Sequence, residues 1–316
     1  MKKFLMLITT LIIICAVLTG CGANNETAVV NTTSGGISVT DDNARTVSLN
    51  SVPQKIIPLS ASFLEPRHEL NASVAARVSS KNGILPAYKD LPQVGSVYNI
   101  NIEKVIEQQP DLVIAYKGMN DKFVRNFEEN GIPAIVLEMR TYGQVKNTVA
   151  VLGKITGNEA KAQEINRKMD AHIAEIKHLL PQKELHIAIL HSTAQNVTVQ
   201  LEGSIAGSTA ELLGFKNIAA GSVPLESNPT AAPYSLETLV AANPDIIYIT
   251  SMGKMETIKA SMQKSIEQSP AWQSLPAVQA GRVYYLPQEM FLLSPGLNYP
   301  AAAEYMAKLA YPELFK

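Results

Sequence analysis

The sequence predicts an α/β fold with two lobes, each built on a mostly parallel central sheet, joined by one long α-helix. Strand-like and helical runs alternate between residues 55 and 139, a pattern typical of parallel sheets covered by helices. Two helical runs with no strand between them occupy residues 141 to 180, and the alternation then resumes up to the C-terminus. These observations predict two α/β halves on either side of a helix.

The N-terminus predicts an export signal. Lys2 and Lys3 precede the apolar run "FLMLITTLIIICAV", which is short for a bilayer span but suits a secretory signal. The motif "LTGC" follows, and it resembles the lipobox of bacterial lipoproteins, in which the signal is cut before the cysteine and the thiol receives a lipid. The resemblance implies that residues 1–20 are removed and that Cys21 is lipidated.

The mature chain is predicted to hold no disulfide. Cys15 and Cys21 are the only cysteines; the first lies in the removed segment and the second would carry the lipid. Residues 21–36 are small and polar without periodicity, which predicts a flexible tether. The folded part is expected to begin at Ile37.

The first lobe is expected to span residues 37–156. Its predicted strands are "KIIPLS" (55–60), "DLVIAY" (111–116) and "AIVLEM" (134–139). Its predicted helices are "NIEKVIEQQ" (101–109) and "DKFVRNFEENG" (121–131), the second of which ends in a glycine.

A long amphipathic helix is predicted within residues 157–181, between the lobes. Apolar residues recur there at spacings of three and four: Ile165, Met169, Ile173, Ile176 and Leu180. Pro181 ends the pattern, because proline cannot continue a helix.

The second lobe is expected to span residues 182–316. Its predicted strands are "LHIAILHS" (185–192), "DIIYIT" (245–250) and "RVYYLP" (282–287). Its predicted helices are "SIAGSTAELLGF" (204–215), "SLETLVAANP" (235–244) and "YPAAAEYMAKLAYPELF" (299–315). The segments "NIEKVIEQQPDLVIAY" and "SLETLVAANPDIIYIT" echo one another, so each lobe is expected to contain the same helix-turn-strand unit.

Several segments, in order, resemble one family. "ISVTDDNARTVSLNSVPQKIIPLS", the two Pro-Asp units and "PAWQSLPAVQAGRVYYLP" are similar to segments of the substrate-binding proteins of iron-siderophore, haem and cobalamin ABC importers. These are class III periplasmic-binding proteins, and the resemblance covers essentially the whole mature chain. It implies a rigid backbone helix between the lobes, a ligand held between them with only small closure, and binding without catalysis or a catalytic cofactor.

The same resemblance implies partners and a location. An acidic residue on each lobe of the family docks onto arginines of the permease, and Glu103 in "NIEKV" and Glu237 in "SLETL" match these positions. Each also falls in the first turn of a helix, where a carboxylate complements the helix dipole without any partner. The chain is therefore expected to act as a lipid-anchored monomer with a permease and an ATPase. It would sit on the extracytoplasmic face of the cell membrane, or in the periplasm of a Gram-negative cell.

A local resemblance favours haem as the ligand. "LPAYKDLPQVGSVYNINIEKV" is similar to the haem-binding lipoproteins of the Gram-positive iron-regulated surface determinant system. That subgroup holds haem iron with a Met after the "VG" step and a His after the "NPDI" strand, and this chain has Tyr98 and Met252 there instead. Tyrosinate and methionine both ligate haem iron, so the pair is a candidate axial set. The departures equally leave a ferric siderophore or cobalamin open.

Further residues follow predicted strands and are expected to face the ligand: Tyr116, Met119, Arg140, Tyr142, His191, Met255, Met290 and Phe291. Arg140 would suit a propionate or a siderophore carboxylate by bidentate pairing. Methionines such as Met252 and Met255 also serve as core filler, and Tyr98 could equally pack its ring and show its hydroxyl to water.

Other functions fit the residues less well. A formal net charge of −1 with 17% charged residues gives no bias toward nucleic acid. A zinc or manganese receptor of the same fold would have to recruit His68, Glu65, Glu138 and His191, without a His-rich loop. A lipoprotein enzyme is disfavoured because the chain has no G-x-S-x-G or H-E-x-x-H motif, and a surface adhesin would show repeats or β-sandwich strands.

Overall fold

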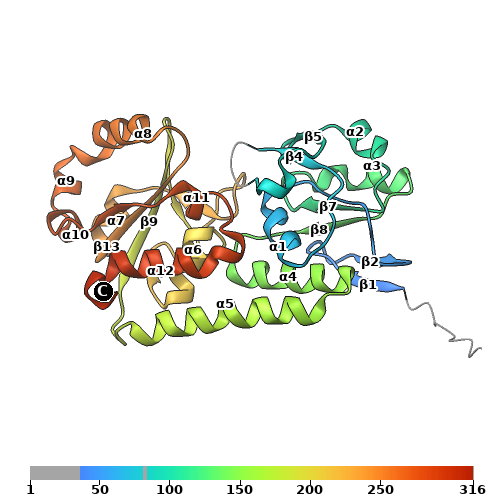
Figure 1. The fold of residues 1–316 in the computed structure, drawn as a ribbon. Coiled ribbons are helices and arrows are strands. Elements are labelled where there is room, and N and C mark those ends of the chain that lie inside the picture. Colours follow the sequence, from blue (N-terminus) through green and yellow to red (C-terminus); the bar gives the residue numbers. More distant parts are fainter. Residues whose placement is uncertain (1–35, 81–83, 316) are drawn as a thin grey trace, which may run out of the picture. The chain divides into compact units, whose positions relative to one another are not determined.

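A computed structural model describes residues 36–80 and 84–315 (Figure 1). The predicted signal segment 1–20, the lipidation site Cys21 and the tether up to residue 35 lie outside the described residues. Within the described ranges, no helix is long and apolar enough to cross a membrane.

The first half of the described chain contains three small sheets. β1 and β2 pair antiparallel, β3, β7 and β8 form a parallel sheet with β7 at its centre, and β5 pairs with β4 in parallel and with β6 antiparallel. The bounds are β1 (Ile37–Thr40), β2 (Thr46–Leu49), β3 (Ile56–Pro58), β4 (Arg77–Ser79), β5 (Gln93–Ser96), β6 (Asn99–Ile100), β7 (Leu112–Tyr116) and β8 (Ala134–Leu137). The three predicted strands of this half are confirmed as β3, β7 and β8.

Short helices cover this region: α1 (Leu64–Glu69), α2 (Ile102–Glu107) and α3 (Val124–Glu129). The helix predicted over residues 121–131 is split, because a 3-10 turn at Asp121–Phe123 precedes α3. Gly131 has a φ of +71°, a conformation that glycine adopts at little cost, and it turns the chain after α3 toward β8.

Two long helices follow, as the sequence predicts. α4 (Tyr142–Thr156) begins with a capping box between Thr141 and Gln144, and Gly157 ends it in the left-handed conformation. α5 (Glu159–Leu179) buries the predicted apolar stripe, and it packs against α4 and against α12 (Tyr299–Ala310) (Figure 1).

The second half is built on one mixed sheet in the order β12-β10-β9-β13-β14, with β11 also pairing with β9. β13 pairs in parallel with both β9 and β14, as expected, whereas β10 and β12 add an antiparallel edge that the sequence did not predict. The strands are β9 (His186–Ser192), β10 (Val197–Gln200), β11 (Lys216–Asn217), β12 (Ala231–Pro233), β13 (Ile246–Ser251) and β14 (Val283–Tyr285). The remaining helices are α6 (Ile205–Leu213), α7 (Leu236–Ala242), α8 (Met255–Met262), α9 (Pro270–Gln273), α10 (Pro276–Gln279) and α11 (Gln288–Phe291).

The sequence echo corresponds to two equivalent units, α2–β7 and α7–β13. Asn101 caps α2 and Ser235 caps α7, each accepting a hydrogen bond from a backbone N–H of the first turn. Gln109 and Asn243, the residues before the two Pro-Asp steps, both have positive φ, at 49° and 46°. Each unit delivers its strand to an interior position, β7 between β3 and β8 and β13 between β9 and β14.

The central strands are mostly apolar because both faces of each sheet are covered. In β7, Leu112 and Ile114 pack in a cluster with residues of α4 and α5, and Val113 and Ala115 pack in a second cluster with residues of α2 and α3. Polar side chains from these strands are therefore confined to the strand ends, which is where the candidate site lies.

Candidate functional site

A cavity of about 520 Å³, here called the main cavity, is lined by residues at or just beyond the carboxyl ends of β3, β7, β8 and β13. Both halves of the chain contribute to it, and its surface is mostly apolar. The sequence-predicted residues that line it are Tyr98, Tyr116, Met119, Arg140 and Met252. Parallel strands bring their carboxyl ends to one edge of a sheet, which places Tyr116, Met119 and Arg140 together, whereas Tyr98 and Met252 reach the cavity from two other sheets.

Tyr98 reaches this cavity from the tip of the β5–β6 hairpin. Ser96 pairs with Asn99 across the hairpin, so Val97 and Tyr98 form its two-residue turn. A Cβ on Gly95 would lie 2.4 Å from the Asn99 carbonyl oxygen, so only glycine fits there. Tyr98 is left 68% exposed.

Asn120 fixes the hairpin to the ends of the parallel strands. Its Oδ1 accepts from the Tyr116 backbone N–H at 2.8 Å, and its Nδ2 donates to the carbonyls of Leu59 at 2.8 Å and Val97 at 3.0 Å. The side chain is fully buried, so each of these bonds replaces one that water would otherwise make. Asn120 thereby ties β3, β7 and the Tyr98 turn together.

Met252 stands directly after β13 on the second half. Its backbone N–H donates to the Ser192 carbonyl at 3.2 Å, which extends the pairing of β13 with β9 by one step. Gln288 donates through Nε2 to the Gly253 carbonyl at 2.8 Å and secures the turn that follows. Met252 is 55% exposed and lines the main cavity.

Arg140 follows β8 and is the one cation among the described residues that line the main cavity. Its Nε lies 3.2 Å from Oε1 of Glu138, whose Oε2 accepts from Nε2 of Gln144 at 3.0 Å. The Tyr116 hydroxyl accepts from the Met139 N–H at 3.3 Å, and burial raises the pKa of this phenol. Tyr116 therefore remains neutral beside Arg140.

Residues 294–298, here called the strap, reach from the second half to the first and border the main cavity. The Ser294 hydroxyl donates to the Met139 carbonyl at 2.6 Å. Glu65 on α1 accepts from the Leu297 N–H at 3.2 Å and from Nδ2 of Asn298 at 3.0 Å. Burial raises the pKa of the Glu65 carboxyl.

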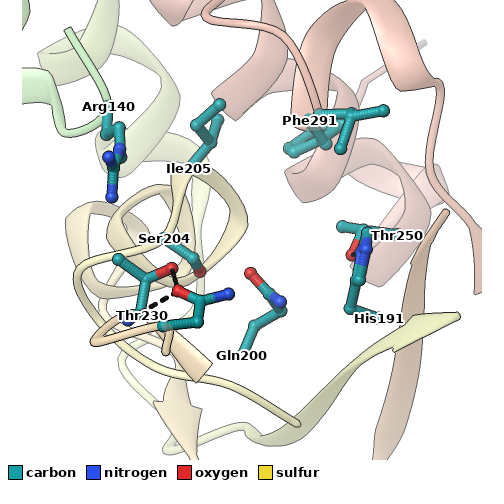
Figure 2. A pocket seen from close by; sticks show the side chains of 10 residues that line it. Arg140, His191, Gln200, Ser204, Ile205, Thr230, Thr250 and Phe291 are labelled. Atoms are coloured by element: carbon teal, nitrogen blue, oxygen red, sulfur yellow. Dashed lines mark hydrogen bonds between the residues drawn. The ribbon is translucent and has the colours of Figure 1, made fainter. Parts of the chain in front are cut away.

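A second, smaller cavity of about 250 Å³ is here called the polar chamber, and Figure 2 shows residues that line it. The two share Arg140, Ile205 and Leu292 in their linings. The predicted residues His191 and Phe291 line the polar chamber rather than the main cavity. Its other lining residues are Gln200, Ser204, Asn228, Thr230 and Thr250.

His191 lies near the carboxyl end of β9, as predicted, with its Nδ1 3.0 Å from the Thr250 hydroxyl oxygen on neighbouring β13. The Thr250 hydroxyl donates to the Leu190 carbonyl at 3.2 Å, so its single proton is committed there. Nδ1 of His191 is then the donor, and Nε2 carries a lone pair. Burial lowers the pKa of His191, which favours this neutral form.

Three predicted ligand-contact residues line neither cavity: Tyr142, Met255 and Met290. Tyr142 is the first residue of α4, and its hydroxyl donates to Oδ1 of Asp170 on α5 at 2.8 Å. Met255 is the first residue of α8, and Met290 packs against the large apolar cluster from α11. Glu103 and Glu237 are both exposed in the first turns of α2 and α7.

Sequence reasoning missed Asn120, Gln200, Asn228 and the strap. Only the polar "YKGMN" turn after β7 hinted at Asn120, because its partners lie far away in the chain. Within the described residues, no group of three or more His, Cys, Asp or Glu side chains is arranged to hold a bare metal ion.

A family model described as "Periplasmic binding protein" matches residues 67–290. An uncharacterized ABC transporter substrate-binding lipoprotein of Bacillus subtilis (strain 168) is 24% identical over 329 residues, covering 100% of both chains. The high-affinity heme uptake system protein IsdE of Staphylococcus aureus is 20% identical over 261 residues, covering 82% of this chain and 88% of its own.

Solved structures share the fold. Staphylococcus aureus IsdE complexed with heme superposes with a TM-score of 0.69 at 20% identity, covering 81% of this chain and 98% of that one. Staphylococcus aureus SirA complexed with staphyloferrin B superposes with a TM-score of 0.68 at 20% identity, covering 88% of this chain and 98% of that one. One fold thus holds ligands of different chemistry in these relatives.

Proposed function

The chain belongs to the periplasmic binding protein family, whose members bind substrates and are not enzymes, and from this premise we propose that it captures an iron complex for an ABC importer. This is the family that the sequence motifs indicate. The proposed ligand is haem, held in the main cavity and delivered to the permease. A ferric siderophore or cobalamin is the alternative.

One observation carries the haem proposal: Tyr98 and Met252 both line a mostly apolar cavity and both keep exposed side chains. A porphyrin is a large apolar disc, and a cavity of about 520 Å³ lies within the range of about 300–1,000 Å³ typical of small-molecule sites. A phenolate oxygen and a thioether sulfur are both established haem-iron ligands. Tyr98 and Met252 are therefore the proposed axial pair.

The charges of the main cavity support haem over a strongly anionic siderophore. Arg140 is its one lining cation among the described residues and is paired with Glu138, while Glu65 and Glu289 add acidic groups. A ferric catecholate carries several negative charges and would meet little compensating charge here. Haem needs compensation only at its two propionates.

The two-lobe arrangement supports limited closure. α5 packs against α4 and α12, and Glu65 bonds to the strap, so movement of one half against the other would break buried contacts. We retain the lobe boundaries at 37–156 and 182–316, with 157–181 as a rigid connection. The cavity would then be largely formed before the ligand arrives.

Glu103 and Glu237 are the proposed docking residues for permease arginines. Both carboxylates are exposed, and they occupy equivalent places in the α2–β7 and α7–β13 units. Exposed charges of this kind steer association and fix its register. A lipid on Cys21 would hold the monomer at the extracytoplasmic face, beside the permease and its ATPase partner.

The direct test is titration of the protein starting after Cys21 with haemin, followed by absorbance. We expect saturable binding with a shifted Soret band and a ligand-field band of tyrosinate or thioether ligation. Parallel titrations with hydroxamate, catecholate and carboxylate ferric siderophores and with cobalamin test the alternative. Failure to bind haemin, together with tight binding of one of these, would replace haem as the ligand.

A further inference from the structure

The polar chamber differs in character from the main cavity beside it. Its lining is mostly polar, it contains no carboxylate among the described residues, and its one cation is Arg140. Figure 2 shows Arg140 on one side of the chamber, His191 on the other and Gln200 between them. The main cavity, by contrast, is mostly apolar and has two acidic residues in its lining.

Some polar groups of the chamber already have partners. The Ser204 hydroxyl donates to the Leu201 carbonyl at 2.7 Å and accepts from the Gly207 N–H at 2.9 Å, so it serves as the cap of α6. The Thr230 hydroxyl donates to Oδ1 of Asn228 at 2.8 Å. These groups shape the wall and are not available to a ligand.

Two amide groups are available. The side-chain amide of Gln200 and the Nδ2 of Asn228 have no hydrogen-bond partner among the described residues, although both line the chamber. Together with the guanidinium of Arg140, they offer N–H donors to a space whose described lining residues include no carboxylate. The complementary group is an oxygen anion, and a carboxylate fits a guanidinium best because two parallel N–H···O bonds can form.

On the basis of the proposed function, we infer that the polar chamber is a subsite for a carboxylate-bearing arm of the transported iron complex, whose iron-bearing body occupies the main cavity. The shared residues Arg140, Ile205 and Leu292 mark where the arm would pass from one space to the other. A haem propionate and a siderophore carboxylate share this chemistry. The subsite would select ligands that carry such an arm over neutral analogues.

The test uses two substitutions that preserve shape and add a negative charge, Gln200→Glu and Asn228→Asp. Asn228→Asp keeps an oxygen to accept from Thr230, so the loop is expected to remain folded. A carboxylate at the half-buried position 200, opposite the ligand's carboxylate, should weaken binding by about tenfold or more, and one at the exposed position 228 should weaken it less because solvent screens the repulsion. Gln195→Glu, at an exposed position after β9, is the matched control and should leave binding unchanged.

Each protein is titrated with haemin, haemin dimethyl ester, a carboxylate ferric siderophore and a hydroxamate ferric siderophore without carboxylates. Haemin and its dimethyl ester form one pair of ligands, and the two siderophores form the other. For whichever pair the wild type binds, we expect both variants to lose affinity for the carboxylate-bearing ligand and to bind the ligand without carboxylates as tightly as wild type does. The pair that responds shows whether the arm is a haem propionate or a siderophore carboxylate. Equal losses for both members, or no loss for either, would overturn the subsite while leaving the proposed function intact. Wild-type protein that binds none of these probes would overturn the subsite, and the proposed function would fall with it only if a catecholate ferric siderophore and cobalamin also fail to bind.

Discussion

The side chains of Tyr98 and Met252 line the same cavity, although one lies at the tip of the β5–β6 hairpin and the other directly after β13. Neither is covered by the protein, with exposed fractions of 68% for Tyr98 and 55% for Met252. A tyrosine and a methionine left open in a mostly apolar cavity are suited to contact a ligand, and both can ligate iron.

Asn120→Ala is expected to destabilise the protein and weaken ligand binding together. It leaves the Tyr116 N–H and the Leu59 and Val97 carbonyls without their partner, at a cost of about 1–3 kcal/mol in the free energy of unfolding. It also frees the turn that carries Tyr98. Chemical denaturation and ligand titration measure the two effects, and Asn130→Ala on the surface is the control. If the variant binds as tightly as wild type, Asn120 does not position Tyr98.

Glu65→Ala is expected to lower the free energy of unfolding by about 1–3 kcal/mol, because the Leu297 N–H and Asn298 Nδ2 lose their acceptor. Glu65→Gln should cost less, since its carbonyl oxygen still accepts from Leu297. Glu69→Ala, on the exposed side of the same helix, is expected to change little. A Glu65→Ala variant as stable as wild type would show that the strap is not anchored by this carboxylate.

The Glu103→Gln and Glu237→Gln double variant is expected to bind ligand normally but to support little uptake. Loss of two first-turn carboxylates should cost only about 0.3–1 kcal/mol each through the helix dipole, so folding is retained. Ligand-dependent growth of iron-limited cells measures uptake, with Glu256→Gln in the first turn of α8 as the matched control. Wild-type uptake by the double variant would argue that these residues do not dock.

Stability is expected to fall as pH decreases below about 6.5, the ordinary pKa of histidine, in part through His191. Burial lowers the pKa of His191 in the folded protein, so the unfolded chain takes up a proton first and the folded state loses stability in this window. His191→Asn, which can still donate to Thr250, should flatten the dependence, whereas His178→Asn at an exposed position should not. Denaturation between about pH 5 and 7 measures the slopes. Parallel slopes for wild type and His191→Asn would contradict the prediction.

Much of the fold could be predicted because its signals are local. Residues close together in the sequence are enough to recognise the helix caps at Asn101 and Ser235 and the apolar stripe of α5. The placement of Tyr116, Arg140 and other residues at one edge followed from a general property of parallel strands.

The remainder depends on contacts between distant segments. β10 has four residues and β12 has three, too few for a hydrophobic pattern to identify them as strands, so the antiparallel edge and the place of Gln200 at the polar chamber were not predictable. Tyr142 and Met255 are each the first residue of a helix. A shift of one or two residues in where such a helix begins decides whether the side chain faces a cavity.

The most direct test of the Tyr98 and Met252 pair compares haemin titrations of wild type, Tyr98→Phe and Met252→Leu, with Met255→Leu as the matched control outside the cavities. We expect a saturable Soret shift in wild type and in the control. Tyr98→Phe should lose any tyrosinate band, Met252→Leu should lose any thioether band, and each should bind haemin about tenfold or more weakly, a change of about 1.4 kcal/mol. Spectra and affinities that are the same in wild type and in both variants would contradict iron ligation by this pair.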